Sequence, residues 1–238
     1  CQSLNDITND CSGLFCLKPD CNSFFFISRK SLQDSYTQEE YEKAVIELHN
    51  FMHTNVKETP NPMNPKTFLK RKQVTFGTSY TFGRQRSEGI PYDREGGMSH
   101  WPLLVQWALQ KAQSMARKYG YNPGSYNAVH ANYYPNGEAG VAPHSDDEDE
   151  MVSGFPIFSF TILAGAKVPR HFSIYLPKSR DQKTFTRVKD ILLDDGDLIV
   201  MAGAMQKEFW HGIDKMTRKA EIAKYEGAPR MNLTVRAF

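Results

Sequence analysis

Late in the sequence the chain reads Arg230-Met231-Asn232-Leu233-Thr234-Val235-Arg236, with polar and apolar side chains in alternation. Successive side chains of a β-strand point to opposite faces, so the apolar residues share one face and both arginines lie on the other. The apolar face suits a hydrophobic core. The polar face suits a small dicarboxylate, because arginine binds carboxylates through paired hydrogen bonds, but it equally suits the solvent side of an ordinary strand.

Further strand-like segments precede this one. Short β-type runs, separated by Gly, Pro, Asn and Asp, are expected near 127–134, 157–164, 171–176, 184–188, 197–201 and 230–237. The first half instead shows two helical patterns, at 37–53 behind a Thr37/Glu40 capping box and at 101–119 with Pro102 in its first turn. Helices followed by a run of strands predict an α+β fold whose later half is a β-sandwich or barrel.

Two segments lack such periodicity. Residues 1–35 are expected to be an irregular segment, and residues 54–75, rich in Pro, Asn and Lys, a loop. The remaining 36–238 are expected to form a single domain, which suits a chain of 238 residues.

All four cysteines lie in the first of these segments, at Cys1, Cys11, Cys16 and Cys21. Their spacing matches no common zinc pattern and lacks the usual close pair, although four thiolates can close a tetrahedral site. We therefore expect reduced thiols rather than a zinc cluster or a disulfide framework.

The composition bears on location and partners. No run of 18 or more apolar residues occurs, so no transmembrane helix is expected. No leader of the secretory type opens the sequence, which begins with Cys1 and can be a piece of a longer product. An intracellular monomer, in the nucleus or the cytoplasm and without membrane contact, is expected.

The net charge of +2 is unevenly spread. Between Asn64 and Arg86 every charged residue is basic, namely Lys66, Lys70, Arg71, Lys72, Arg84 and Arg86. A stretch of one sign attracts polyanions such as nucleic acids. The alternative is a solvated loop with no partner.

Candidate metal ligands stand in His144-Ser145-Asp146. On an extended chain, residues two apart project to the same side and can reach one ion. Another histidine would complete the two-histidine, one-carboxylate set that binds iron(II) and leaves three positions open. Among the seven histidines His211 is the best candidate, because it follows an expected strand and precedes the turn-like Gly212. Each motif alone is a weak signal, but their order along the chain is rare by chance.

In this order the motifs resemble those of the AlkB-like dioxygenases, a family of iron(II)- and 2-oxoglutarate-dependent enzymes that demethylate nucleic acids. The resemblance covers about 66–238. The matching segments are Asn132-Tyr133-Tyr134, His144-Ser145-Asp146-Asp147-Glu148, Phe209-Trp210-His211-Gly212 and 230–236, with Arg71-Lys72-Gln73 and Tyr80-Thr81-Phe82 resembling the substrate side. The resemblance implies a double-stranded β-helix (a jelly roll) with both helices outside it and the site at its mouth.

The resemblance also implies a role for each matched residue. The iron ligands would be His144, Asp146 and His211. The residues that bind 2-oxoglutarate would be Asn132, Tyr134, Arg230, Asn232 and Arg236. Of these, Arg230 would pair with the distal carboxylate, while Asn132 and Arg236 would contact the metal-chelating end. The residues that border the substrate base would be Tyr80, Thr81, Phe82, Glu148 and Arg170.

The expected reaction is oxidative demethylation of N-alkylated bases of the 1-methyladenine or 3-methylcytosine type, in DNA or RNA, with Fe(II), 2-oxoglutarate and O₂. Aromatic faces and a carboxylate suit such cationic bases, which must be single-stranded or flipped out to reach a buried iron. One alternative keeps the dioxygenase chemistry and changes the substrate to a protein or a small molecule. Another is a catalytically silent nucleic-acid-binding module.

The resemblance has gaps. Residues 1–35 match nothing in the family, and 54–70 show no clear counterpart of the intercalating device of members that act on duplex DNA. Phe68 is the candidate for that role.

Overall fold

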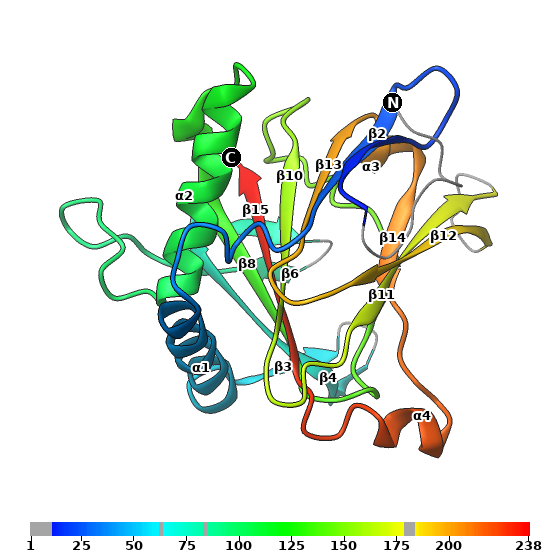
Figure 1. The fold of residues 1–238 in the computed structure, drawn as a ribbon. Helices are drawn as coiled ribbons and strands as arrows, with labels where there is room; N and C mark the ends of the chain where they lie inside the picture. Colours follow the sequence, from blue (N-terminus) through cyan, green and yellow to red (C-terminus); the bar gives the residue numbers. More distant parts are fainter. Residues whose placement is uncertain (1–10, 62–63, 83–84, 179–183) are drawn as a thin grey trace.

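The computed structural model describes residues 11–61, 64–82, 85–178 and 184–238. Its largest element is a nine-stranded sheet that runs through the middle of the molecule (Figure 1). In spatial order its strands are β1 (Gly13–Cys16), β2 (Ser23–Ser28), β13 (Leu198–Gly203), β10 (Ile157–Leu163), β15 (Arg230–Ala237), β8 (Tyr126–Tyr134), β4 (Asn64–Gly77) and β3 (Glu58–Asn61), with β7 (Gly89–Ile90) beside β4.

A second sheet has four strands, in the order β12 (Phe185–Leu193), β11 (Arg170–Pro177), β14 (Trp210–Ile213) and β9 (Val141–His144). The strands β5 (Tyr80–Phe82) and β6 (Gln85–Ser87) pair with each other. Apolar side chains of both larger sheets meet in one buried cluster, which includes Phe25, Ile199, Phe172 and Ile191. Two facing, antiparallel sheets of this kind form the predicted jelly roll.

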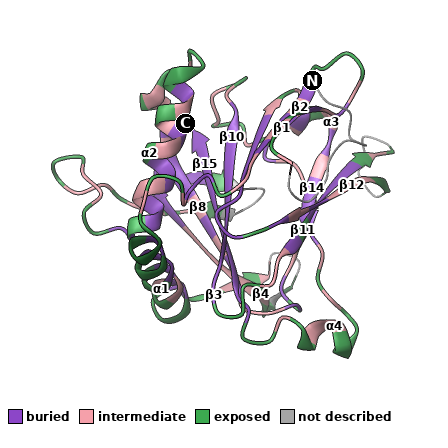
Figure 2. Cartoon of the chain, viewed as in Figure 1, coloured by how far each residue is buried: buried purple, intermediate pink, exposed green. Residues whose placement is uncertain are grey.

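The helices α1 (Gln38–Thr54) and α2 (Leu103–Lys118) cover the outer face of the large sheet (Figure 1). Both were predicted, and α1 begins at the expected capping box, in which the Glu40 backbone N–H donates to the Thr37 hydroxyl. Their exposed and buried sides are plain in Figure 2. The short helices are η2 (Pro123–Ser125), α3 (Met205–Glu208) and α4 (Lys219–Ala223).

The central strand β15 has the two faces that its sequence predicts. Met231, Leu233 and Val235 join the core beneath the helices. Arg230 and Arg236, on the opposite face, are also buried, at 2% and 4% exposure. A solvent-facing polar strand is therefore excluded, and the guanidinium groups point into the interior between the sheets.

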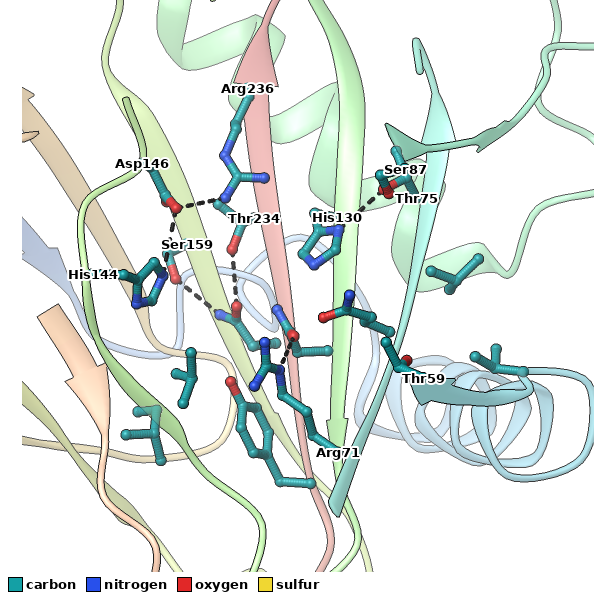
Figure 3. Close-up of a pocket in the computed structure, with 18 of the residues that line it drawn as sticks. Thr59, Arg71, Thr75, Ser87, His130, His144, Asp146, Ser159, Thr234 and Arg236 are labelled. Atoms are coloured by element: carbon teal, nitrogen blue, oxygen red, sulfur yellow. Dashed lines mark hydrogen bonds and ion pairs between the residues drawn. The ribbon is translucent and has the colours of Figure 1, made fainter. Parts of the chain in front are cut away.

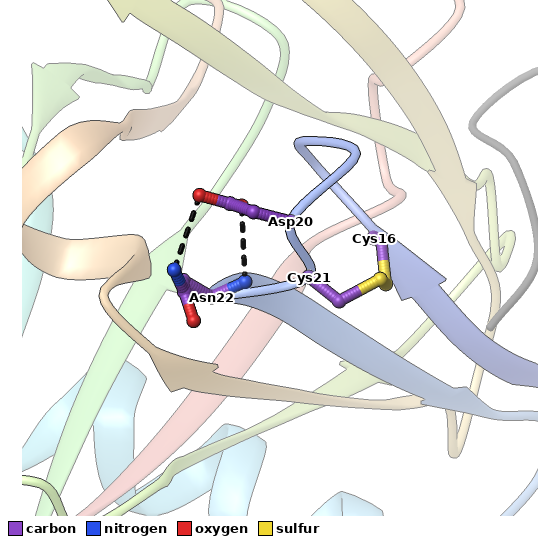
Figure 4. The surroundings of a disulfide bond; sticks show 4 residues. All are labelled: Cys16, Asp20, Cys21 and Asn22. Atoms are coloured by element: carbon purple, nitrogen blue, oxygen red, sulfur yellow. Dashed lines mark hydrogen bonds between the residues drawn. A yellow bond between two sulfur atoms is a disulfide. The ribbon is translucent and has the colours of Figure 1, made fainter.

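The predicted irregularity of residues 1–35 is wrong for residues 13–28. The strand β2 pairs with β13 along six residues, and its Phe25 and Ile27 are fully buried. In Ser23–Ser28 every second residue is buried, a pattern typical of a strand. The polar residues on either side of this segment obscured the pattern in the sequence. Reduced thiols are also wrong for Cys16 and Cys21, which form a disulfide across the β1–β2 turn (Figure 4), whereas Cys1 lies outside the described residues.

The predicted loop at 54–75 is wrong as well, because β3 and β4 occupy most of it. β4 has 14 residues and pairs with β8 from Lys72 to Gly77. Its lysines and arginines made the segment resemble a solvated loop, but in an edge region of a sheet charged side chains can point outward. Within the described ranges no helix has the length and apolar character needed to cross a membrane.

Candidate active site

A cavity of about 620 Å³ lies between the two sheets, and Figure 3 shows the residues around it. The large sheet contributes alternate side chains of β4, β8 and β15, and the small sheet contributes the ends of β9 and β14. Most of the residues that the sequence singled out line this cavity: Tyr80, Asn132, Tyr134, His144, Asp146, His211, Arg230, Asn232 and Arg236.

The expected metal ligands converge at one end of it. His144 closes β9 and lies opposite His211 on the neighbouring β14. Asp146 Oδ1 is 3.5 Å from His144 Nε2, and its Oδ2 is 3.7 Å from His211 Nε2. One ligand atom from each of the three residues lies within 4.8 Å of the other two. Two imidazoles and one carboxylate at this spacing are the donor set for iron(II).

Neighbouring groups hold these ligands in place. The backbone N–H of Asp146 donates to Gln206 Oε1 at 2.9 Å, and His144 Nδ1 lies 3.0 Å from the Ala142 carbonyl. The Phe172 ring stacks on His211, with centroids 5.2 Å apart. Contacts of this kind fix the direction of a ligand before the metal arrives.

The protonation states also suit a metal. Burial lowers the pKa of His211 to about 3, so its imidazole is neutral and can donate a lone pair. Burial alone would raise the pKa of Asp146, but the Arg236 guanidinium and the two histidines hold it well below its usual range. The carboxylate is therefore ionised, and Arg236 Nη2 lies 2.7 Å from its Oδ1.

At the other end of the cavity, Arg230 faces Tyr134 across the β8–β15 ladder. Arg230 Nη2 donates to Thr161 Oγ1 at 3.0 Å, and the guanidinium lies over the Tyr134 ring at 5.2 Å. Its Nε and Nη1 are buried without a hydrogen-bond partner in the described structure. Burial lowers the pKa of Arg230 to about 10, so it remains cationic at neutral pH. Buried unpaired donors on a cation call for an anion, and the distal carboxylate of 2-oxoglutarate fits them.

The two asparagines between these ends differ. The Asn232 amide donates to Ser159 Oγ and the Phe160 carbonyl and accepts from Thr234 Oγ1, so its hydrogen bonds are used within the protein. Asn132 accepts from Arg71 Nε at 3.2 Å. That bond directs the Asn132 amide nitrogen away from Arg71, where it can donate to a bound ligand.

The expected substrate residues are only partly brought together. Tyr80 is buried, and its hydroxyl accepts from Arg236 Nη1 at 2.7 Å. Thr81 is exposed, and its backbone N–H donates to Glu150 at 2.6 Å, so it points away from the cavity. The backbone of Phe82 belongs to β5, but its side chain lies outside the described part of the structure.

Glu148 has a buried carboxylate. Its side chain is 3% exposed and lies 4.0 Å from Arg236 Nη2, and neither oxygen has a hydrogen-bond partner in the described structure. Burial raises the pKa of Glu148. Glu148 is not among the residues that line the cavity, but Arg236, which lies beside it, is.

Arg170 does not line the cavity itself. It is 2% exposed, and its guanidinium donates to the backbone carbonyls of Ala139, Asn136 and Asp214. The guanidinium also lies 5.8 Å from the ring of Tyr134, which does line the cavity. Its contacts therefore support the wall of the site from behind, and a role at the substrate stays a prediction.

Sequence reasoning missed several residues of the site. Gln206 and Phe172 support the metal ligands, and Thr75, Ser87 and His130 form a polar group on the wall of β4, β6 and β8. The signal for His130 was available, since it lies two residues from Asn132 on an expected strand, whereas Thr75 lies in a segment that was expected to be a loop. The contacts of Gln206 and Phe172 depend on the tertiary arrangement.

A family model described as the 2OG-Fe(II) oxygenase superfamily matches residues 28–236, most of the chain. The chain belongs to this superfamily. Its cofactors are therefore Fe(II) and 2-oxoglutarate, for which the His144, Asp146 and His211 group provides a possible iron site. The predicted dioxygenase chemistry and jelly-roll fold are confirmed at the level of this superfamily, and a catalytically silent module is set aside.

Among curated relatives, this superfamily member is similar to alpha-ketoglutarate-dependent dioxygenase alkB homolog 3. The Bos taurus protein is 27% identical over 158 residues, which are 66% of this chain and 47% of that protein. The Homo sapiens protein is likewise 27% identical over 158 residues, 66% of this chain and 47% of its own length. The chain thus spans about half the length of the curated relatives it matches.

Among solved structures, the fold is similar to that of a prolyl hydroxylase from Trichoplax adhaerens in complex with a hypoxia inducible factor oxygen degradation domain peptide fragment. The TM-score is 0.50 at 11% identity, over 90% of this chain and 83% of that chain. At that identity the likeness concerns the fold alone.

Proposed function

We propose that this dioxygenase removes N-linked methyl groups from cationic bases of the 1-methyladenine or 3-methylcytosine type in single-stranded or flipped-out nucleic acid. The observation that carries the proposal is the Glu148 carboxylate, which is buried without a hydrogen-bond partner and lies 4.0 Å from Arg236, a residue that lines the cavity. A buried carboxylate needs a cation or a hydrogen-bond donor to offset its lost hydration. An N-methylated base with a positive charge and an exocyclic amino group supplies both.

The size of the site supports the same substrate class. A cavity of about 620 Å³ lies in the range that proteins use for small organic ligands, and it reaches from the Arg230 end to the metal ligands. Tyr80 belongs to the wall at the metal end, where its ring stacks on Phe238 with centroids 4.7 Å apart and its hydroxyl accepts from Arg236.

The surface beside the cavity supports a polyanionic substrate. Lys57 and Arg86 line the cavity, and exposed Lys66 and Lys70 continue the basic surface along β4. Phe68 lies between these two lysines in sequence and is 54% exposed. Lysines on a strand that borders the site can hold a phosphate backbone while one base enters. Arg84 lies outside the described residues.

In this function each end of the cavity has one task. His144, Asp146 and His211 would hold the iron, and Arg230 would hold the distal carboxylate of 2-oxoglutarate. When bound, the iron and 2-oxoglutarate supply the oxidising chemistry with O₂. The chain supplies orientation and charge: Arg236 keeps Asp146 ionised, and Glu148 would offset the positive charge of the base.

The direct test is formaldehyde release from short single-stranded DNA and RNA that carry 1-methyladenine or 3-methylcytosine, with Fe(II), ascorbate and 2-oxoglutarate. The Asp146→Asn variant is the control, because it removes the charge of the ligand and keeps its shape. Release that depends on Asp146 is expected. No release from any of the oligonucleotides, together with continued turnover of 2-oxoglutarate to succinate, would contradict the proposal and favour a protein or small-molecule substrate.

A further inference from the structure

A polar cluster lines the cavity apart from the residues assigned to iron and 2-oxoglutarate. It consists of His130 on β8, Thr75 on β4 and Ser87 on β6 (Figure 3). His130 Nδ1 lies 3.0 Å from Thr75 Oγ1, which lies 2.6 Å from Ser87 Oγ. His130 and Thr75 are direct partners in the β4–β8 ladder, so the backbone fixes their approach. The three side chains thus form one hydrogen-bonded chain that leads from β6 to the imidazole.

The other ring nitrogen of His130 is available to a ligand. The ring is partly open to the cavity, and in the described structure Nε2 has no hydrogen-bond partner. The neighbours of His130 on its strand, Val129 and Ala131, turn to the opposite face and join the core under the helices. Packing therefore leaves the ring no orientation except toward the cavity.

The ring is neutral at physiological pH. Burial, together with the positive charges of Arg236 and Arg71, lowers the pKa of His130 to about 3. A neutral imidazole has one donor nitrogen and one acceptor nitrogen, and the partner of one decides the role of the other. If Nδ1–H donates to Thr75 Oγ1, and Thr75 donates to Ser87, then Nε2 presents a lone pair to the cavity.

We propose that His130 determines substrate specificity by accepting, through Nε2, a hydrogen bond from the exocyclic amino group of the alkylated base. The inference rests on the proposed function, since it takes such a base as the substrate. His130 lines the same cavity as His144, Asp146 and His211, so a base whose N-methyl group lies against the expected iron site can present its amino edge to the imidazole. In this arrangement Glu148 would offset the positive charge of the base, and His130 would recognise its exocyclic amino group.

Two substrates that differ at C4 test this contact, and because they also differ in charge, the change in their ratio on substitution of His130 is what isolates it. 3-Methylcytosine and 3-methyluracil both carry a methyl group on N3, but 3-methylcytosine has an amino group at C4 where 3-methyluracil has a carbonyl oxygen. A carbonyl oxygen facing the Nε2 lone pair leaves two acceptors opposed, and a site built for one hydrogen bond rejects a substrate that cannot make it. His130 should therefore favour 3-methylcytosine, and the preference should depend on Thr75.

The experiment measures kcat/KM on single-stranded oligonucleotides that carry either base, for the wild type, His130→Leu and Thr75→Val. His171→Leu is the matched control, because His171 is an exposed histidine on β11. The wild type should prefer 3-methylcytosine, and His130→Leu should lower the ratio of the two kcat/KM values by about fivefold or more, the effect of one hydrogen bond of about 1 kcal/mol. Thr75→Val should move the ratio in the same direction, and His171→Leu should leave it unchanged.

The ratio is a readout that loss of folded protein does not move, because both substrates meet the same enzyme. A wild-type preference for 3-methyluracil, or a ratio that is unchanged in both His130→Leu and Thr75→Val, would overturn the role of His130 while leaving the demethylase in place. Demethylation of neither base by the wild type, with 2-oxoglutarate still turned over, would instead overturn the proposed function and this inference with it.

Discussion

Arg230 is the side chain best suited to hold the distal carboxylate of 2-oxoglutarate. The guanidinium is buried, is bound on one side to Thr161, and leaves Nε and Nη1 unpaired in the described structure. Two unpaired donors on a planar group match a carboxylate better than a single ammonium does. Burying Nε and Nη1 of Arg230 without a partner costs desolvation free energy. An anion bound in the cavity would offset this cost, which makes the burial of the polar face of β15 understandable.

We expect Arg230→Lys to raise the KM for 2-oxoglutarate by about tenfold to a hundredfold, because the variant keeps the charge but loses the paired geometry worth about 1.5–3 kcal/mol. Titration with Mn²⁺ should show unchanged metal binding, since the metal ligands lie at the opposite end of the cavity. Lys167→Arg, an exchange of the same two residue types outside the cavity, serves as the control. An unchanged KM for 2-oxoglutarate in Arg230→Lys would mean that the carboxylate binds elsewhere.

His130 should also make the stability of the fold depend on pH. Its pKa in the folded protein is about 3, below its ordinary value of about 6.5, so the folded state favours the neutral ring. The resulting stabilisation is complete above about pH 6.5 and is lost as the pH falls toward 3, because the unfolded chain takes up the proton first. The charged groups that face His130 are Arg236 on β15, Arg71 on β4, and Asp146 and His144 around β9.

The measurement is the free energy of unfolding in urea at pH 7 and at pH 5 for the wild type, His130→Leu and His171→Leu. The wild type and His171→Leu should lose more stability between these pH values than His130→Leu does. Equal losses in all three would show that His130 titrates normally in the folded protein.

At the scale of the element, β15 was predictable because its alternation is unbroken and each face has one chemical character. The helices were predictable for the same reason, through the capping box at Thr37 and the apolar stripe of α1. β4 was not, because basic residues fill the part of the strand that borders the surface. Lys70 is 71% exposed, whereas Thr75 and Phe76, further along the same strand, are buried. A strand that passes from solvent into the core has no single hydrophobic pattern along its length.

The metal ligands were recognised through their order along the chain, but their supports were not. Gln206 and Phe172 contact Asp146 and His211 across long separations in sequence. The pairing of β11 with β14 brings Phe172 to His211, and the short helix α3 carries Gln206. The backbone contacts of Arg170 were missed for a related reason. Its neighbours along the chain give no sign that three backbone carbonyls surround it.

The strand β2 offers a test of whether residues 13–28 belong to the fold. Phe25 is fully buried between the sheets, whereas Leu14 on β1 is 41% exposed. Phe25→Ala should lower the free energy of unfolding by about 3–5 kcal/mol through lost burial and the cavity left behind. Leu14→Ala should change it by less than about 1 kcal/mol. Urea denaturation of both variants measures these free energies. If Phe25→Ala changed the free energy of unfolding as little as Leu14→Ala, β2 would add nothing to the stability of the core.

On the scale of the whole molecule, the two sheets contribute different groups to the cavity. The small sheet brings two metal ligands on neighbouring strands, and the large sheet brings the charged and polar rows of β4, β8 and β15. The same β4 that carries Arg71 and Thr75 into the cavity continues outward to the exposed Lys66 and Lys70. One strand therefore links the interior of the site to the surface where a phosphate backbone would lie.

This arrangement predicts that surface charge and catalysis are separable. Lys66→Ala should weaken the binding of a methylated single-stranded oligonucleotide, and it should reduce the slope of log K against log salt concentration by about 0.7, the value for one phosphate contact on a single strand. The KM for 2-oxoglutarate should not change, because the lysine lies outside the cavity. Lys43→Ala is the matched control, since Lys43 is 73% exposed on α1, on the helix-covered side of the large sheet. If both variants reduced the slope equally, or neither did, the nucleic acid would not follow β4, and the basic segment would be a solvated surface like any other.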